Sequence, residues 1–470
     1  MNKRLLLLSL VFALVFMLVT PAHAGVAPPE SPPGSNIDGN SESTQVRIVA
    51  ETVTLTVSED PADKANAIAK TEAVFTMRNL GTVEEKMNVR FPLSFFNGNS
   101  DGFGNFPEIK SIEVKINGKT VSTRKEMQLR YSSEYSYDER EEIPWAVFEA
   151  VFPPNQDVTI EVVYNAQGFG YYPYQVFKYV LETGAGWNGT IGSAEIILRL
   201  PYEANKKNVW VEGVTGYGDP TSGGVFSGNE VRWKFEDLEP TYENNLQFIV
   251  ATPSLWKSVL SETENTSKNP NDGEAWGRLG KAYKEVIRAT KGWLREDASG
   301  VEMFELSRAA YEKSLSLLPN DPLWHYGYAD LLWSHYYFSV YGVGKPDTQN
   351  ELPAILRSLE TALKLKPDLQ EAKDLLHFIS YSVPGAVQQN EDGTYTMLGL
   401  TATPIPPTPW GGDVTPTALP TSTVQPATAS TEIASPTPSE PTKTNPLCGS
   451  AAMILLAFGL VTGFKRKTTK

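Results

Sequence analysis

The chain has 470 residues, a formal net charge of −14 at pH 7 and 41% hydrophobic residues. This length predicts two or three domains, and the apolar content is enough for ordinary cores. The acidic balance argues against nucleic-acid binding, which needs a basic surface. Cys448 is the only cysteine, so no intramolecular disulfide can form.

The first 24 residues have the pattern of a secretory signal peptide. Lys3 and Arg4 precede an apolar run at 5–19, and the exit sequence is Ala22-His23-Ala24. This pattern predicts cleavage after Ala24. An uncleaved anchor is the alternative, but the run is shorter than the about 20 residues that a spanning helix needs. We expect export of the body of the chain, with a flexible leader at 25–45.

Residues 46–252 have the hydrophobic pattern of β-strands. The sequence Asn117-Gly118 is the strongest short-range signal for a hairpin. No convincing helix interrupts the region, so the pattern predicts one antiparallel β-sandwich, or two, rather than a parallel sheet. The expected strands include 46–57, 74–77, 113–116, 158–162, 175–181, 194–200, 231–235 and 246–250.

Two short stretches of this region resemble β-sandwich domains of uncharacterised bacterial envelope proteins. They are Trp145-Ala146-Val147-Phe148 leading to Phe152-Pro153-Pro154, and Thr183-Gly184-Ala185-Gly186-Trp187. Such domains have no assigned activity, so the resemblance bears on the fold alone.

The next region, 256–385, is helical and contains an internal repeat. The sequences Pro270-Asn271-Asp272, Pro319-Asn320-Asp321 and Pro367-Asp368 recur at nearly equal spacing. After the first comes the spacing W-x2-L-G-x2-Y, formed by Trp276, Leu279, Gly280 and Tyr283. This segment resembles a tetratricopeptide-repeat module. The resemblance implies stacked helix pairs, with Gly280 allowing close packing, and a surface that binds a protein partner.

The repeat units are longer than the about 34 residues usual for that family. The surplus falls between the two helices of each unit, at 288–300 and 341–351. Two complete units and a closing helix at 369–380 form a minimal array, because such arrays generally need about three units. We expect this short array to be stabilised by packing against the β-domain or against its own insertions.

The C-terminal part predicts a stalk and a membrane anchor. Residues 398–445 are mostly Thr, Pro, Ser and Ala, which lack the apolar content to fold and predict a disordered stalk, open to O-glycosylation. The uncharged apolar stretch 447–464 predicts a transmembrane helix, and the basic tail 465–470 should remain cytoplasmic. Two alternatives are a buried core helix and a tail removed by a sorting enzyme. Cys448, at the membrane boundary, is inert or carries a lipid.

One loop has the ligand spacing of a calcium site. Residues 97–108 place oxygen-bearing side chains at the spacing of an EF-hand loop, namely Asn97, Asn99, Asp101 and Glu108, with Gly102 at the turn. Gly104 and Pro107 depart from that pattern, and the flanks are strand-like. A polar β-loop is therefore the alternative, and the sequence leaves calcium binding open.

No other motif predicts chemistry. His325, His335 and His377 lie in the helical region, where packing explains them, and no zinc cluster is apparent. No nucleophile elbow, phosphate loop or zinc-protease motif occurs, although a distant carboxylate pair stays open. Aromatic residues in expected loops could bind sugars or cover the ends of a sandwich: Tyr131, Tyr135, Tyr137, Phe169, Tyr171, Tyr172 and Tyr174. We expect no catalytic, cofactor-binding or metal-ligating residues, and no cofactor.

These segments predict a multidomain fold: an all-β antiparallel sandwich, an all-α tetratricopeptide-like repeat, a disordered stalk and a transmembrane helix. We expect a single-pass cell-membrane protein, mostly outside the cytoplasm, that acts as an interaction or scaffold protein and binds a protein partner through its helices. The alternative is an extracytoplasmic polysaccharide-binding or polysaccharide-active β-sandwich protein.

Overall fold

The computed structural model describes residues 38–39, 44–94, 108–129, 142–170, 172–213, 215, 218–288, 294–338 and 351–398. The chain divides into two units, 1–404 and 405–470, and every described residue belongs to the first. The expected signal peptide at 1–24, membrane span at 447–464 and tail at 465–470 lie outside the described residues, as do nearly all of the leader at 25–45 and the stalk at 398–445. These stay predictions.

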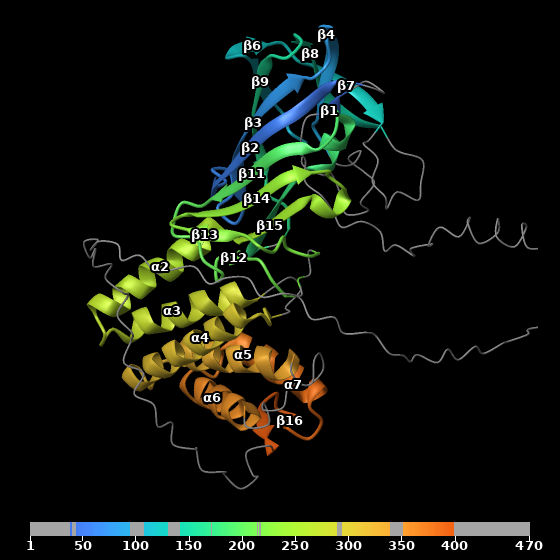
Figure 1. Cartoon of the computed structure of the whole chain (residues 1–470). Coiled ribbons are helices and arrows are strands. Elements are labelled where there is room, and N and C mark those ends of the chain that lie inside the picture. Colours follow the sequence, from blue (N-terminus) through green and yellow to red (C-terminus); the bar gives the residue numbers. More distant parts are fainter. Residues whose placement is uncertain are drawn as a thin grey trace, which may run out of the picture. The chain divides into compact units, whose positions relative to one another are not determined.

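The largest sheet has eight strands and is mixed (Figure 1). Its long central strands β2 (Val46–Glu59) and β3 (Ala67–Asn79) are antiparallel. Strand β2 also pairs in parallel with β11 (Ile191–Arg199). The order across the sheet is β13 (Val225–Ser227), β14 (Glu230–Leu238), β11, β2, β3, β9 (Asp157–Gln167), β5 (Ile112–Ile116) and β6 (Lys119–Val121).

Two smaller antiparallel sheets complete the strand region. One has the order β1 (Asp38–Gly39), β4 (Glu85–Pro92), β8 (Glu142–Phe152) and β7 (Arg124–Leu129). The other has the order β10 (Tyr174–Tyr179), β15 (Leu246–Ala251) and β12 (Val209–Trp210). Short 3-10 helices lie at Glu182–Gly186 and Tyr242–Asn244.

Along the strands, buried side chains alternate with more exposed ones. In β3 the inward positions are buried, while Lys70 and Val74 between them are exposed. The predicted hairpin is confirmed: Asn117 and Gly118 join β5 to β6 with φ angles of 50° and 76°, the left-handed region that such turns require.

A bulge in β2 turns a carboxylate into the core. The pairing of β2 with β3 shifts between Ile48 and Ala50, so the alternation changes phase and Glu51 is only 2% exposed. The hydroxyl of Tyr179 donates a hydrogen bond of 2.7 Å to the Glu51 carboxylate. The phase change thus places a charged residue inside without leaving it unpartnered.

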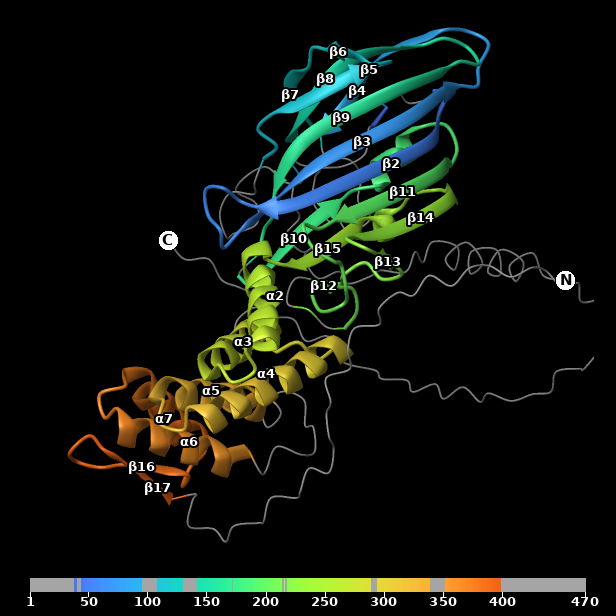
Figure 2. The same cartoon turned by 90° about the vertical axis from the view of Figure 1, so that its left-hand side faces the viewer.

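The helices follow the strands as a stack (Figure 2). Helix α2 begins at Pro253, directly after β15, which suits proline because the first helical N–H needs no partner. The stack ends with a hairpin of β16 (Val387–Gln389) and β17 (Tyr395–Met397). The helices are α2 (Pro253–Lys268), α3 (Gly273–Ile287), α4 (Ala298–Leu317), α5 (Pro322–Phe338), α6 (Glu351–Leu365) and α7 (Gln370–Ser382).

The recurring Pro-Asn-Asp sequences begin helices. The Asp272 carboxylate accepts a hydrogen bond from the backbone N–H of Ala275 and caps α3. Asp321 does the same for Leu323 and Trp324 at the start of α5. Each aspartate therefore satisfies backbone donors that the first helical turn leaves free.

Glycines let three helices meet at one ring. Tyr311 of α4 is 1% exposed. A Cβ atom on Gly280 of α3, or on Gly327 of α5, would lie 2.9 Å from this ring. Both glycines are thus needed for the observed spacing of the helices.

The hydrophobic core is continuous from the strands to α7. Trp256 of α2 is buried, and its ring lies 6.3 Å from that of Tyr202 in the strand region. Ser254 of α2 also contacts Lys64 in the β2–β3 connection, and Lys257 contacts Glu59 at the end of β2. The first helix is thereby part of the strand unit's packing.

The predicted fold class is wrong. The main sheet is mixed, so it is not an antiparallel sandwich, and the continuous core means that an all-β domain is not followed by a separate repeat module. Alternation specifies which face a side chain takes, not the direction of the neighbouring strand, so it could not predict the parallel pair. In the part of the chain that is described, no helix is long and apolar enough to cross a membrane.

Candidate functional site

A buried ion pair lies between α3 and α4. Arg295 and Asp297 have side chains that are 0% and 2% exposed. Arg295 donates two parallel hydrogen bonds to the Asp297 carboxylate, at 2.7 and 2.8 Å. Burial lowers the pKa of Arg295, but the neighbouring Tyr174 and Asp297 raise the pKa by more, so it lies above its usual range. The guanidinium therefore remains charged.

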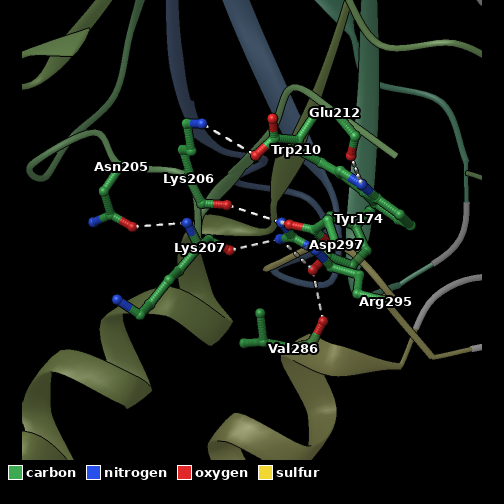
Figure 3. Close-up of polar contacts among 9 residues, drawn as sticks. All are labelled: Tyr174, Asn205, Lys206, Lys207, Trp210, Glu212, Val286, Arg295 and Asp297. Atoms are coloured by element: carbon green, nitrogen blue, oxygen red, sulfur yellow. Dashed lines mark hydrogen bonds and ion pairs between the residues drawn. The ribbon is translucent and has the colours of Figure 1, made fainter. Parts of the chain in front are cut away.

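The same guanidinium reaches the strand unit (Figure 3). It donates hydrogen bonds to the carbonyl oxygens of Lys206 and Lys207, at 2.8 and 2.9 Å. It also donates to the Tyr174 hydroxyl at 3.1 Å, and that hydroxyl donates to the Val286 carbonyl at 2.6 Å. One side chain thus connects β10, the turn before β12, and the helices α3 and α4.

Aromatic rings enclose this arginine. The guanidinium carbon lies 4.9 Å from the ring centre of Trp210 and 5.8 Å from that of Tyr174. The two rings are themselves 5.3 Å apart. Cation–π contacts of this kind contribute about 2 kcal/mol when water is excluded. We call Arg295, Asp297, Tyr174 and Trp210 the arginine joint.

A pocket opens between the strand unit and the first two helices. It has a volume of about 300 Å³. Tyr172, two residues before Tyr174, is one of its lining residues. Leu255 and Ala282, both buried, form apolar lining. The remaining lining residues are polar: Ser254, Ser258, Glu262, Arg278, Lys281 and Glu285. We call this the junction pocket.

The charges of the junction pocket form two pairs of unequal strength. Arg278 donates two hydrogen bonds to Glu262, at 2.8 and 3.2 Å. Burial raises the pKa of Glu262, but the bonds from Arg278 and Asn265 lower the pKa by more, and it stays ionised. Lys281 and Glu285 are only loosely paired, at 3.7 Å.

Tyr172 closes one side of the pocket. Its hydroxyl donates a hydrogen bond of 2.7 Å to the Glu285 carboxylate. Partial burial and this bond both raise the pKa of Tyr172 above its usual range. The phenol therefore remains a donor at neutral pH and orients the carboxylate.

The outer side of α7 carries an exposed stripe with acidic and aromatic ends. Glu371, Asp374, Phe378 and Tyr381 recur at helical spacing and are exposed, Phe378 by 45% and Tyr381 by 72%. The Phe378 ring lies 5.9 Å from the buried Trp333 ring and 5.4 Å from the Tyr337 ring, both of α5. We call Phe378, Tyr381, Trp333 and Tyr337 the aromatic face.

The three described histidines each contact a neighbouring group. His325 Nε2 lies 2.9 Å from the Pro319 carbonyl oxygen. His335 contacts the Glu351 carboxylate at 2.8 Å and stacks on Phe304. His377 contacts the exposed Tyr381 ring edge-on. The described residues contain no group of three or more His, Cys, Asp or Glu side chains that could hold a metal ion.

The predicted calcium loop is largely outside the described residues. Of the loop residues named above only Glu108 is described, and Lys125 donates a hydrogen bond to it. Among the aromatic loop residues, Tyr131, Tyr135, Tyr137 and Tyr171 also lie outside. Phe169 packs against the core, Tyr174 is buried in the joint, and Tyr172 lines the pocket.

The sequence reasoning missed both the arginine joint and the junction pocket. Its one usable signal was the surplus at 288–300, which contains Arg295 and Asp297. The length of that insertion indicated an added role, but not its contact with Tyr174, because the partner lies in another region of the chain.

Comparisons with known proteins assign no family. No protein-family model matches the sequence, and no curated protein matches it. Similar solved structures include a Legionella pneumophila protein described as a candidate nutrient binding protein, with 16% identity and a TM-score of 0.40, covering 60% of this chain and 100% of that one. A Deinococcus radiodurans M1 zinc metallopeptidase has 10% identity and a TM-score of 0.23, and the match covers 72% of this chain and 91% of the peptidase chain.

A third similar structure is a Thermobaculum terrenum O-GlcNAc transferase mutant, with 18% identity and a TM-score of 0.20. It covers 28% of this chain and 20% of the transferase chain. All these TM-scores are low, so none of the likenesses supports an argument about function. The tetratricopeptide resemblance stays a prediction.

Proposed function

We propose that this protein is a membrane-attached scaffold of the cell surface that binds a partner protein through the aromatic face of its helical stack. The observation that carries the proposal is the exposure of Phe378 and Tyr381 on α7. Exposed aromatic side chains that adjoin buried ones are typical of protein-binding surfaces, because they supply contact area at low entropic cost.

The chemistry of this surface favours a proline-rich segment with basic flanking residues. Aromatic surfaces bind extended proline-rich chains, which have little conformational entropy to lose. Glu371 and Asp374 lie on the same stripe of α7, next to the aromatic residues. Their carboxylates would attract lysine or arginine beside the prolines.

The arginine joint supports a scaffold role. The buried contacts of Arg295 attach the helices to the strand unit, so a partner held on α7 would keep a set position relative to that unit. Export rests on the signal-peptide pattern at 1–24, and attachment to the membrane rests on the apolar segment at 447–464 with the basic tail at 465–470.

The binding proposal is tested by titrating the full-length protein, in detergent, with fluorescent proline-rich peptides that carry arginine or glutamate flanks. We expect binding of the arginine-flanked peptides. The double variant Phe378→Ala/Tyr381→Ala should weaken binding by about tenfold or more. The matched control is Leu260→Ala, an exposed apolar residue of α2, which should leave binding unchanged. Equal binding by both variants would refute the proposal.

The location is tested separately, by protease treatment of intact cells followed by membrane fractionation. Release of a fragment that contains the strands and helices supports a surface protein held near its C-terminal end. Full protection in intact cells, with digestion only after lysis, would refute the surface location.

A further inference from the structure

We propose that the junction pocket binds a small zwitterion of the α-amino acid or dipeptide class. This is a second binding activity, separate from the aromatic face, because the pocket is lined from Tyr172, α2 and α3 whereas the aromatic face belongs to α5 and α7. Its position between two structural parts is a common place for small-molecule sites.

The charge pattern of the pocket carries the proposal. Its lining contains two carboxylates, Glu262 and Glu285, and two cations, Arg278 and Lys281. These charges balance, so a ligand with a net charge would be attracted by the groups of one sign and repelled by those of the other. A zwitterion offers an ammonium to a carboxylate and a carboxylate to a cation, and keeps the pocket neutral.

The loose pair supplies the binding groups. Lys281 and Glu285 are 3.7 Å apart, and the Lys281 side chain is 60% exposed. Little direct hydrogen bonding is therefore lost when a ligand inserts between them. The Glu285 carboxylate, oriented by Tyr172, receives the ligand ammonium, while Lys281 turns to the ligand carboxylate.

The tight pair gives the pocket a fixed edge. Arg278 and Glu262 both line the pocket, and the two hydrogen bonds between them link α3 to α2. The arginine joint fixes the end of α3 through the bond from Tyr174 to Val286. The pocket is thus arranged before the ligand arrives, which lowers the entropic cost of binding.

Size limits the ligand. A volume of about 300 Å³ is at the lower end for ligand pockets. Leu255 and Ala282 offer an apolar contact for one side chain. The pocket therefore fits an amino acid or dipeptide, and longer peptides would extend into solvent.

The experiment is isothermal titration of the full-length protein in detergent with the common amino acids and a set of dipeptides. Each ligand that binds is compared with its N-acetyl and its C-amide derivative. We expect saturable binding by at least one zwitterion, with a loss of about tenfold or more on removing either charge. If no zwitterion binds, or if both derivatives bind as well as the parent, the proposal is wrong.

Variants then locate the binding. Ser258→Trp places a large side chain in the pocket from an exposed position and should abolish binding. Glu285→Gln should weaken it by about tenfold. Lys364→Met, at an exposed lysine far along the stack on α6, is the control. Binding that survives Ser258→Trp with an unchanged melting temperature would place the ligand elsewhere. Peptide binding to the aromatic face, measured in the same variants, should be unchanged, so the two proposals fail separately.

Discussion

Arg295 and Tyr174 are 121 residues apart in the sequence, yet the guanidinium of Arg295 donates a hydrogen bond of 3.1 Å to the hydroxyl of Tyr174. The same hydroxyl donates to the Val286 carbonyl at 2.6 Å. Tyr174 therefore acts as donor to α3 and acceptor from the α3–α4 connection. This arrangement makes the attachment of the helices depend on a few buried polar contacts.

Replacing Arg295 by leucine should destabilise the protein strongly. The variant leaves the Asp297 carboxylate buried without its partner, which costs about 3–5 kcal/mol. Urea denaturation followed by circular dichroism measures the free energy of unfolding. Arg308→Leu is the control, because Arg308 pairs with a half-exposed Glu305 within α4 and little change is expected. Equal free energies of unfolding for the two variants would mean that the arginine joint stabilises the protein no more than an ion pair on the surface of α4.

Gly280→Ala should destabilise the helical stack, although alanine is the better helix former by about 1 kcal/mol. The added Cβ would lie 2.9 Å from the Tyr311 ring, and such overpacking costs about 1–3 kcal/mol. Thermal unfolding reports the change. Glu274→Ala, at an exposed position of the same helix, should shift the melting temperature little. A stabilised Gly280→Ala variant would contradict the packing described for Tyr311.

The protein should lose stability steeply at alkaline pH. Burial raises the pKa of five buried tyrosines above the ordinary value of 10.0, namely Tyr164, Tyr174, Tyr179, Tyr202 and Tyr311. The folded state keeps their protons, whereas the unfolded state releases them near pH 10. Their contribution is complete below that pH and is lost above it, at about 1.4 kcal/mol per pH unit for each tyrosine.

The slope of unfolding free energy against pH, measured by urea titrations above pH 10, checks this expectation. Tyr202→Phe should reduce the slope by one proton's share, because phenylalanine has no ionisable hydroxyl. The variant loses only a 3.3 Å hydrogen bond from that hydroxyl to the Ala251 carbonyl. A slope that is the same in parent and variant would show that Tyr202 ionises alike in both states.

Asp330→Asn should weaken the contact between α3 and α5. The Asp330 carboxylate accepts hydrogen bonds from Lys284 at 2.8 Å and from Arg288 at 2.6 Å, and both Lys284 and Asp330 are largely buried. Burial raises the pKa of Asp330, but the two cations lower the pKa by more, so it is depressed overall. The stability that Asp330 contributes is present above the unfolded pKa of about 3.9 and is lost as pH falls through the folded pKa.

We expect Asp330→Asn to cost about 3–5 kcal/mol at neutral pH, because two cations lose their counter-charge, and to cost less in acid. Denaturation at neutral pH and in acid measures both effects. Glu149→Gln, at the exposed pair with Lys86, should have little effect at either pH. A cost that does not change with pH would mean that the pair is not ionised in the folded protein.

The sequence predicted local structure well where short-range chemistry decides it. The Asn117-Gly118 hairpin, the helical region and the strands β2, β3, β5, β9, β10, β11, β14 and β15 follow from turn residues, helix caps and alternation. The strands β4, β7 and β8 were not among the strands named from the sequence. It could not predict the bulge that turns Glu51 inward, because the shift by one residue depends on pairing with β3. The fold class was wrong for the same reason, since the direction of β11 beside β2 is a long-range choice.

By itself, the sequence determined the acidic charge, the absence of an intramolecular disulfide and the positions of caps and turns, because these depend on composition or on neighbours a few residues away. Only the tertiary structure decided that Arg295 meets Tyr174, that Lys281 and Glu285 face a pocket with Tyr172, and that Phe378 stays exposed beside Trp333. Each of these arrangements brings together residues from distant parts of the chain. Their proximity is set by how the core packs, which no local pattern encodes.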